Sequence, residues 1–475
     1  MRQLVSIVFI LLFASLHLAA LNVDVHGEFR NRAVYLMNKD AKSETGDTLA
    51  IFDSRLRVWL ESGVNTNLGF VYNLQIGDVS WGDLSGTSRK DGEQHFIAGG
   101  SQGTEGINLK TRQMYMRYQD GDSSFLIGFV PFKTPLAFLL DSNLPGLVLN
   151  TSLFGLDVRM MYARAYAGPS WNGDNKDKVL ASKTADAVDL GDDRNDYFLS
   201  AGYVIGEYLG LTGWLLVDDN NRFKHEAPTS KKLFSDLYYW GVQAKGKLSS
   251  ALTYEANLVI GTGSITSVGE GSESVSSWAF QGKGSVALEG FKFKFQYRML
   301  SGNSASDTDP GSPVQQFAVL DGDEGSTGSW MGLLFGGGPF ADQYYFHYGS
   351  ASARRVNITK GYFVRNDPGI TALEFCIEKD MHEGKATFIL SGGYAQTTRA
   401  VLDADGEEAY TLGVELDIGL KTRLMKELEL YIQLAYLFPG SALGPTIALD
   451  NAVYSRPAMG TDPVLRIDAA LAMSF

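Results

Sequence analysis

The chain has 475 residues, of which 12% are aromatic and 20% charged, and its formal net charge is −13. Its aromatic content excludes a disordered chain, and the single cysteine, Cys376, excludes a disulfide scaffold. The acidic balance excludes a basic nucleic-acid-binding protein. After residue 20, no apolar run of about 18 residues or more could cross a membrane as a helix.

The first twenty residues have the layout of a secretory signal peptide. A short basic start at residues 1–3 precedes an apolar stretch over 4–18, and two alanines at 19–20 give a small-residue exit. We therefore expect residues 1–20 to be cleaved and residues 21–475 to form the mature protein. An uncleaved anchor is the less favoured alternative, because the apolar run is short for a membrane span.

Apolar and polar residues alternate with a period of two through the rest of the chain, which predicts an all-β protein. In residues 291–299 every odd position is apolar, and Lys292, Lys294 and Arg298 stand at even positions. In chain order, the predicted strands are 22–37, 49–62, 66–79, 107–119, 123–133, 145–152, 155–166, 195–206, 208–219, 235–248, 251–262, 275–288, 290–301, 369–380, 384–396, 409–423, 427–438 and 463–475.

The connections between these strands alternate in length. Connections that follow odd-numbered strands have 11 residues or more, and those that follow even-numbered strands have three or fewer. Transmembrane barrels combine short periplasmic turns with long external loops, and an even strand number leaves both termini on the periplasmic side. The rhythm therefore predicts a transmembrane antiparallel up-and-down β-barrel of about 18 strands, within a range of 16 to 20. A soluble sandwich, propeller or β-helix is less favoured, because it has no reason to sort its loops by parity.

The alternation also assigns the two faces of the predicted barrel. Lipid offers no hydrogen-bonding partner, so the sheet must close, with apolar alternates facing lipid and polar alternates facing the lumen. Eighteen strands enclose more space than side chains fill, which predicts an aqueous channel. The phase is unresolved in 208–219 and in 107–119, where Lys110 and Arg112 share their parity with Met114 and Met116.

Basic residues gather at the predicted lumen positions. The pore-lining candidates are Arg30, Arg32, Arg55, Arg57, Arg159, Lys292, Lys294 and Arg298. A cluster of one sign in a narrow aqueous channel enriches the opposite ion, so these residues favour a mild anion preference. The alternative, to which we give more weight, is that they are solvated residues paired with lumen carboxylates, which are nearly as numerous.

The connection over residues 302–368 is too long to be a simple turn. It contains two apolar clusters, at 330–335 and 344–348, followed by the basic residues Arg354, Arg355, Lys360 and Arg365. Apolar clusters need cover, so we expect part of this connection to fold into or over the barrel mouth. It would then constrict the pore, with the four basic residues at the constriction. An additional hairpin, which would make twenty strands, is the alternative.

Three segments carry a resemblance to a known family. Residues 52–61 (FDSRLRVWLE), with 75–78 (QIGD) and 81–82 (WG), resemble the second and third strands of Gram-negative outer-membrane porins related to the alginate-export family. No match to that family's substrate-lining residues is found, so its polymer specificity is not carried over. The resemblance implies an integral outer-membrane protein in contact with lipid and lipopolysaccharide, and it is compatible with a homotrimer.

The C-terminal strand carries a further implication of this resemblance. In porins, the last strand with its final Phe is recognised by the barrel-assembly machinery. The positions that match are Ile467, Leu471, Met473 and Phe475. At 473 this chain has Met where an aromatic residue is usual.

Signals for catalysis and metal binding are weak. The six histidines show no metal-ligand spacing, and the acidic segments 321–324 and 403–408 do not complete a Ca²⁺ loop. We therefore expect no catalytic residue, no metal and no cofactor. The predicted function is an outer-membrane porin for passive diffusion of small hydrophilic solutes and ions. The alternatives are a substrate-specific channel for a sugar, an organic acid or an alginate-like polysaccharide and, less favoured, an outer-membrane hydrolase.

Overall fold

The computed structural model describes residues 22–38, 41–44, 46, 48–81, 109–166, 194–220, 233–267, 271–303, 313–317, 320, 329–335, 368–403, 405–443 and 460–475. The predicted signal peptide, residues 1–20, lies outside these ranges. No helix within them is long and apolar enough to span a membrane.

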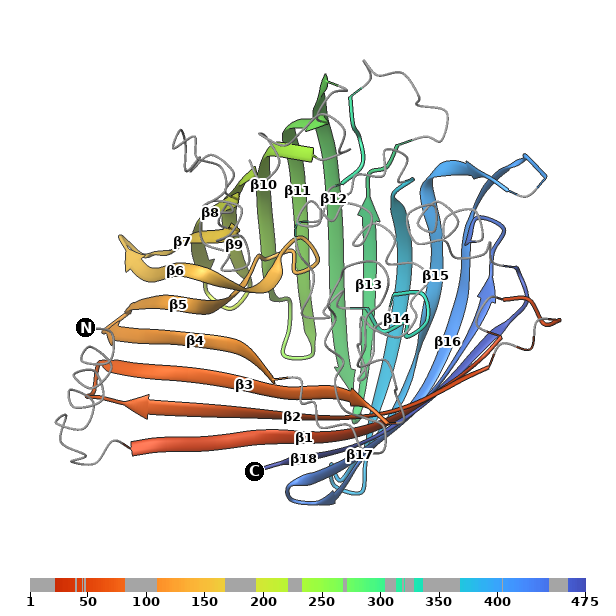
Figure 1. Cartoon of the computed structure of the whole chain (residues 1–475), viewed down its shortest axis with the longest axis horizontal. Coiled ribbons are helices and arrows are strands. Elements are labelled where there is room, and N and C mark those ends of the chain that lie inside the picture. The colour runs from red at the N-terminus through yellow and green to blue at the C-terminus, as the bar shows by residue number, and fades with distance from the viewer. Residues whose placement is uncertain are drawn as a thin grey trace, which may run out of the picture.

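The described residues form eighteen strands in one closed antiparallel barrel (Figure 1). Each strand pairs with the next along the chain, and β1 also pairs with β18. The predicted all-β barrel is therefore confirmed. The strands are β1 (Asn22–Met37), β2 (Leu49–Gly63), β3 (Leu68–Ser80), β4 (Leu109–Asp120), β5 (Ser123–Lys133), β6 (Asp141–Leu153), β7 (Leu156–Tyr166), β8 (Arg194–Ile205), β9 (Leu209–Asn220), β10 (Leu233–Lys247), β11 (Leu252–Ser267), β12 (Gly271–Leu288), β13 (Phe291–Leu300), β14 (Ile370–Met381), β15 (Ala386–Leu402), β16 (Glu408–Met425), β17 (Leu428–Pro439) and β18 (Val464–Ser474).

Several strands extend further than the sequence pattern predicts. β6 and β12 each begin four residues before their predicted start, in the stretches 141–144 (DSNL) and 271–274 (GSES), which contain aspartate and asparagine or glycine. Residues of these types are depleted in strands, so strand propensity alone does not predict these extensions. β15 continues to Leu402 across two register shifts, which interrupt the alternation beyond Gln396.

Side chains alternate between the two faces of the sheet as the pattern predicts. On β13, Phe295 and Tyr297 are 53% and 37% exposed on the outer face, whereas Gln296 between them is 1% exposed on the inner face. Large apolar side chains are exposed on the outer face of many other strands. A contiguous apolar exterior of this kind fits a lipid environment and not an aqueous one.

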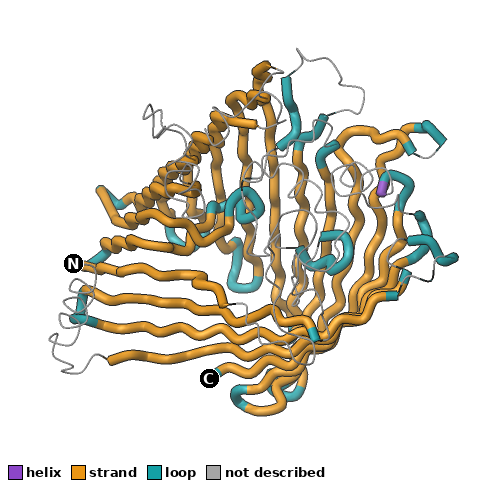
Figure 2. The backbone as a smooth tube through the Cα atoms, viewed as in Figure 1, coloured by secondary structure: helices purple, strands orange, loops and turns teal. Residues whose placement is uncertain are grey.

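The inner face is not uniformly polar, because short chain segments fold inside the barrel (Figure 2). Residues 136–140, together with Val314, Phe317 and Leu320, belong to an apolar cluster that covers the inner face from β5 to β13. Residues 331–335 belong to a second apolar cluster with side chains of β1 and β14 to β18. Part of the lumen that alternation alone marks as aqueous is therefore packed with apolar groups.

The first of these clusters explains why the phase of β9 is unreadable. Trp214 and Leu216 point inward and are buried, while Leu211 on the other face is exposed. Both faces of the strand are apolar, so no alternation shows in the sequence. A strand that faces lipid on one side and an inner apolar cluster on the other reads as a continuous apolar run.

A bulge explains the phase conflict of β4. Asn73 of β3 pairs with Gln113, but the next residue, Leu74, pairs with Thr111, so Arg112 is an extra residue in β4. Met114 beyond the bulge is exposed on the outer face. Arg112 itself reaches the inner-face residue Gln75. The inserted residue thus lets a basic and an apolar residue of equal parity lie on opposite faces.

The connection over 302–368 adds no barrel strand between its neighbours, because β13 pairs directly with β14 over ten residue pairs. Its described parts are 302–303, 313–317, 320, 329–335 and 368. An isolated bridge joins Val314 to Val275 of β12. The alternative of an additional hairpin is therefore wrong. Arg354, Arg355, Lys360 and Arg365 lie outside the described residues.

The chain's last residue lies against the first strand, close to the pairing that closes the barrel. Gly27 and Phe475 exchange two backbone hydrogen bonds, of 2.8 and 3.1 Å. A Cβ atom on Gly27 would lie 2.4 Å from the Phe475 ring, so the ring occupies the space that glycine leaves. β1 and Phe475 therefore meet through an aromatic ring that packs on a glycine. The other assembly-signal candidates, Ile467, Leu471 and Met473, lie on the outer face of β18.

We predict that Gly27→Leu lowers the yield of folded barrel severalfold, because the new side chain displaces the Phe475 ring at the closure. The yield is measured by the heat-modifiable mobility of the refolded protein in detergent gels. Gly213→Leu is the control, because it adds the same side chain at a strand glycine with nothing within 4 Å and with an ordinary backbone conformation. Equal yields for the two variants would contradict the role of this contact.

Candidate functional site

The basic residues of β1 and β2 lie side by side on the inner face of the barrel. The register places Arg30 opposite Arg55, Arg32 opposite Asp53 and Glu28 opposite Arg57. Directly opposed residues of an antiparallel pair have Cβ atoms about 5 Å apart, so each charge meets its cross-strand neighbour.

The carboxylates of Glu28 and Asp53 bind different arginines. Arg32 donates to Asp53 Oδ2 through Nε at 2.9 Å, and Arg30 lies 3.5 Å from the other oxygen of the same carboxylate. Arg55 donates to Glu28 at 2.8 Å. Asp53 and Arg32 are almost completely buried. Arg30, Arg32 and Arg55 therefore form ion pairs with carboxylates. This agrees with the alternative interpretation of the sequence, in which lumen arginines are paired with lumen carboxylates.

Two further arginines share a neutral partner. Arg57 Nε donates to Gln75 Oε1 at 2.8 Å, and Arg112 Nη1 donates to the same oxygen at 3.0 Å. The Gln75 amide nitrogen donates to the carbonyl of Gly77 at 2.8 Å, which holds the oxygen toward the two guanidinium groups. Sequence reasoning left Arg112 unassigned because of the bulge. The phase break between Arg112 and Met114 was the available signal for it.

We call Arg30, Arg32, Arg55, Arg57 and Arg112 the basic wall. It spans β1, β2 and β4, with Gln75 of β3 between them. Arg55, Arg57 and Arg112 are only partly buried, so their charge is accessible to solvent inside the barrel. Water-accessible guanidinium groups on neighbouring strands form a surface that attracts anions.

The other pore-lining candidates lie away from this wall. The guanidinium of Arg159 on β7 stacks 4.5 Å from the Phe132 ring centre. Lys294 on β13 pairs with Glu378 of β14, and Lys292 on the same strand is exposed. Arg298 lies buried, 2.8 Å from Glu374. The structure thus brings four of the eight candidates together, adds Arg112 to them, and separates the remaining four.

Acidic residues dominate a second inner surface, on β14 and β16. Glu374, Glu415 and Asp417 are all buried, and segment 329–335 of the long connection lies against them. The alternation of apolar and polar residues in these strands agrees with the inward position of these carboxylates. It could not predict that chain segments cover them.

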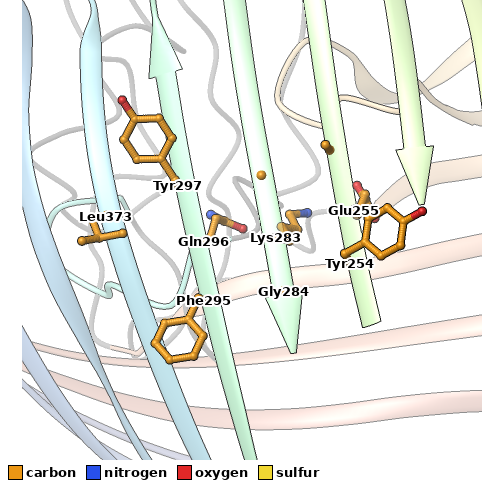
Figure 3. Close-up of a pocket in the computed structure, with 10 residues that line it drawn as sticks. Tyr254, Glu255, Lys283, Gly284, Phe295, Gln296, Tyr297 and Leu373 are labelled. Atoms are coloured by element: carbon orange, nitrogen blue, oxygen red, sulfur yellow. The ribbon is translucent and has the colours of Figure 1, made fainter. Parts of the chain in front are cut away.

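A shallow hollow lies on β11 to β14 of the barrel wall (Figure 3). Its volume is about 340 Å³, and Tyr254, Phe295, Tyr297 and Leu373 line it around Gly282 and Gly284. Phe295, Tyr297 and Leu373 belong to the exposed outer face. The hollow therefore opens mainly away from the lumen and from the basic wall. Among the described residues, no group of three or more His, Cys, Asp or Glu could hold a metal ion.

A closed antiparallel barrel of eighteen strands, apolar outside and lined by charged side chains, has the fold of integral outer-membrane porins. Solved porin structures resemble it over nearly the whole chain. OccK8 (OprE) of Pseudomonas aeruginosa matches with a TM-score of 0.51 and 11% identity, covering 96% of this chain and 98% of that one.

Two Acinetobacter baumannii structures match similarly. OccAB4 has a TM-score of 0.52 and covers 95% of this chain, and OccAB2 has a TM-score of 0.51 and covers 96%; each is 11% identical and is covered to 98% of its own length. At these identities the likeness shows the fold alone. No protein-family model matches the chain, and no curated protein does.

We predict that deletion of Arg112 leaves the folded fraction near that of the unchanged protein, whereas deletion of Ile127 in β5 lowers it strongly. Without Arg112, Gln113 stays opposite Asn73 and Thr111 stays opposite Leu74, so every other side chain of β4 keeps its face. β5 pairs with β4 and β6 without a bulge, so a deletion there shifts one end of the strand by one residue and moves its apolar side chains to the wrong face. Heat-modifiable gel mobility measures both variants, and a strong loss of folding in the Arg112 deletion would contradict the bulge.

Proposed function

We propose that the protein is an outer-membrane channel that lets small hydrophilic solutes and ions diffuse passively and that prefers anions. The observation that carries the proposal is the basic wall. Its solvent-accessible members are Arg55, Arg57 and Arg112, whose side chains lie on the inner face of the barrel. In a narrow aqueous path between low-dielectric walls, such a cluster raises the local concentration of anions.

The positions of the carboxylates support the sign of this preference. Asp53 is buried between Arg30 and Arg32, and Glu374 is buried beside Arg298. The charge of each of these carboxylates is therefore offset by a neighbouring guanidinium group, whereas Arg57 and Arg112 share the neutral Gln75. Although the whole chain has a net charge of −13, the local balance at the basic wall is positive.

The apolar outer face supports contact with outer-membrane lipid and lipopolysaccharide, and the C-terminal strand supports recognition by the barrel-assembly machinery. The proposal includes no catalytic residue and no cofactor. A substrate-specific channel for a sugar, an organic acid or an alginate-like polysaccharide is the second candidate. The inward-folded segments favour it, because a narrowed path makes closer contact with a solute.

We predict that the refolded protein gives ohmic single-channel steps in a planar bilayer, with a reversal potential of the anion-selective sign under a KCl gradient. Arg57→Gln should lower the anion-to-cation permeability ratio. Two charges 4 Å apart in water interact by about 1 kcal/mol, so up to roughly a fivefold change is expected for one removed charge. Lys426→Gln is the control, because Lys426 lies at a short turn with its side chain 92% exposed.

The results of this conductance measurement distinguish the two candidate functions. A cation-selective reversal potential, or equal effects of the two variants, would contradict the basic wall as the origin of selectivity. No conductance from a folded barrel would contradict the open channel. Current block that saturates with the concentration of an added organic acid or sugar would favour the substrate-specific channel.

A further inference from the structure

Residues 329–335, which we call the ledge, are held against the inner face of the barrel by carboxylates from two strands. Leu333 and Leu334 donate their backbone N–H groups to the two oxygens of Glu415, each at 2.7 Å. The preceding residue, Gly332, donates to Asp417 Oδ2 at 3.2 Å. Three consecutive backbone N–H groups of the ledge thus donate hydrogen bonds to two neighbouring carboxylates on the inner face of β16.

Glu374 of β14 holds the start of the ledge in the same way. Its Oε2 accepts from Ser329 Oγ at 2.6 Å and from the Trp330 N–H at 2.8 Å. Its Oε1 lies 2.8 Å from Arg298 Nη2 and accepts from Gln296 at 3.1 Å. The carboxylate therefore joins the ledge to β13 as well as to β14.

Basic groups complete the contact on both sides of the ledge. The Arg466 guanidinium on β18 pairs with Asp468 at 2.8 Å and donates to the Gly332 carbonyl at 3.3 Å. The Arg298 guanidinium lies 5.0 Å from the centre of the Phe335 ring. The ledge is therefore bound through its backbone N–H groups, the Ser329 hydroxyl, the backbone carbonyls of Trp330 and Gly332 and an aromatic ring.

The wall is also shaped to receive the ledge. Gly393 of β15 pairs with Glu374 of β14 on one side and with Glu415 of β16 on the other, so it lies between two carboxylates that bind the ledge. A Cβ atom on Gly393 would lie 3.1 Å from Met331 Sδ. Met331, Leu333 and Leu334 are buried in one apolar cluster with inward alanines of the wall. Small wall residues thus leave the depth that the ledge side chains fill.

The hydrogen bonds of these carboxylates hold the ledge against the barrel wall. An ionised carboxylate in a buried position is unfavourable unless it is hydrogen-bonded or paired. Hydrogen bonds to a charged acceptor are roughly twice as strong as neutral ones. Three buried carboxylates that converge on one short segment therefore hold it more firmly than its apolar contacts alone would.

We propose that Glu374, Glu415 and Asp417 are positioning residues that fix the ledge as a built-in constriction and so set the width of the channel. The proposal rests on the proposed channel function and extends it. The ledge occupies the inner surface of β13 to β18, and the basic wall lies on β1, β2 and β4. Because β18 is the neighbour of β1, the ledge and the basic wall lie next to each other on the inner face, and solutes would pass along both.

The test compares single-channel conductance in four refolded variants. Glu415→Gln with Asp417→Asn removes the charges that the ledge amides bind, and replacement of 329–335 by a Gly/Ser linker of equal length removes the ledge side chains. Glu378→Gln is the matched control, an inward carboxylate of β14 that pairs with Lys294. In the fourth variant, the β16 double substitution is combined with the linker.

We expect the double substitution to raise conductance at least halfway to that of the linker variant, and to add nothing once the linker is present. Glu415→Asp should restore conductance toward the unchanged value when it replaces Glu415→Gln. Glu378→Gln should leave the hydrogen exchange of the 329–335 amides unchanged and raise conductance less than the double substitution does, because Glu378 pairs with Lys294. Unchanged conductance in the double variant, or an equal rise in the linker background, would overturn the proposal.

Two further measurements keep the test decisive if a variant does not fold or if the protein does not conduct. Gly332→Leu places a side chain 3.3 Å from Gln433 and 3.7 Å from Glu415, so it should lift the ledge with every carboxylate intact and raise conductance equally. Hydrogen exchange of the 329–335 amides needs no conduction. We expect protection that the double substitution abolishes, and unprotected amides in the unchanged protein would overturn the proposal even if the channel conducts.

Discussion

The pairing of β1 with β18 is the constraint on which the rest of the structure depends. It joins residues 28–37 to 465–474 and gives every strand a hydrogen-bonded neighbour on both sides. In lipid, each unpaired backbone group costs several kcal/mol, so an open edge of ten residues would be prohibitive. Closure therefore permits the apolar outer face, and it also creates the inner space (Figure 1).

The inner space is divided by what covers each part of the wall. From β5 to β13 it is covered by apolar side chains of inward-folded segments, and from β13 to β18 buried carboxylates bind the backbone of the ledge. On β2 and β4, Arg55, Arg57 and Arg112 retain contact with solvent. Buried ion pairs and the carboxylates that bind the ledge thus hold the structure together, and the proposed anion preference rests on the partly exposed arginines.

The sequence predicts the barrel well because the alternation reports a local property, the face to which each side chain points. It fails where a non-local contact changes the surroundings of a face. In β9 the inner cluster makes both faces apolar, and in β4 one inserted residue, Arg112, reverses the phase. Both departures leave a trace in the sequence, as a continuous apolar run and as a parity conflict.

The ledge could be predicted only in part. The apolar run at 330–335 indicates a segment that needs cover, but its partners lie some 80 positions away along the chain, as Leu333 and Glu415 do. No periodicity links a loop to the strand that binds it. Backbone donors also carry no side-chain signature, so carboxylates that bind backbone N–H groups cannot be told from those that face water.

If the protein is a channel, the inward residues of the basic wall line a water-filled path. The direct measurement is block of single-channel current by a charged, water-soluble thiol reagent at neighbouring positions of β2, in a Cys376→Ala background that removes the only native thiol. We expect Arg57→Cys to be modified and its current reduced, and Val58→Cys, on the opposite face, to be unaffected. Equal reactivity at both positions, or modification of Val58→Cys alone, would contradict a water-filled path along the basic wall.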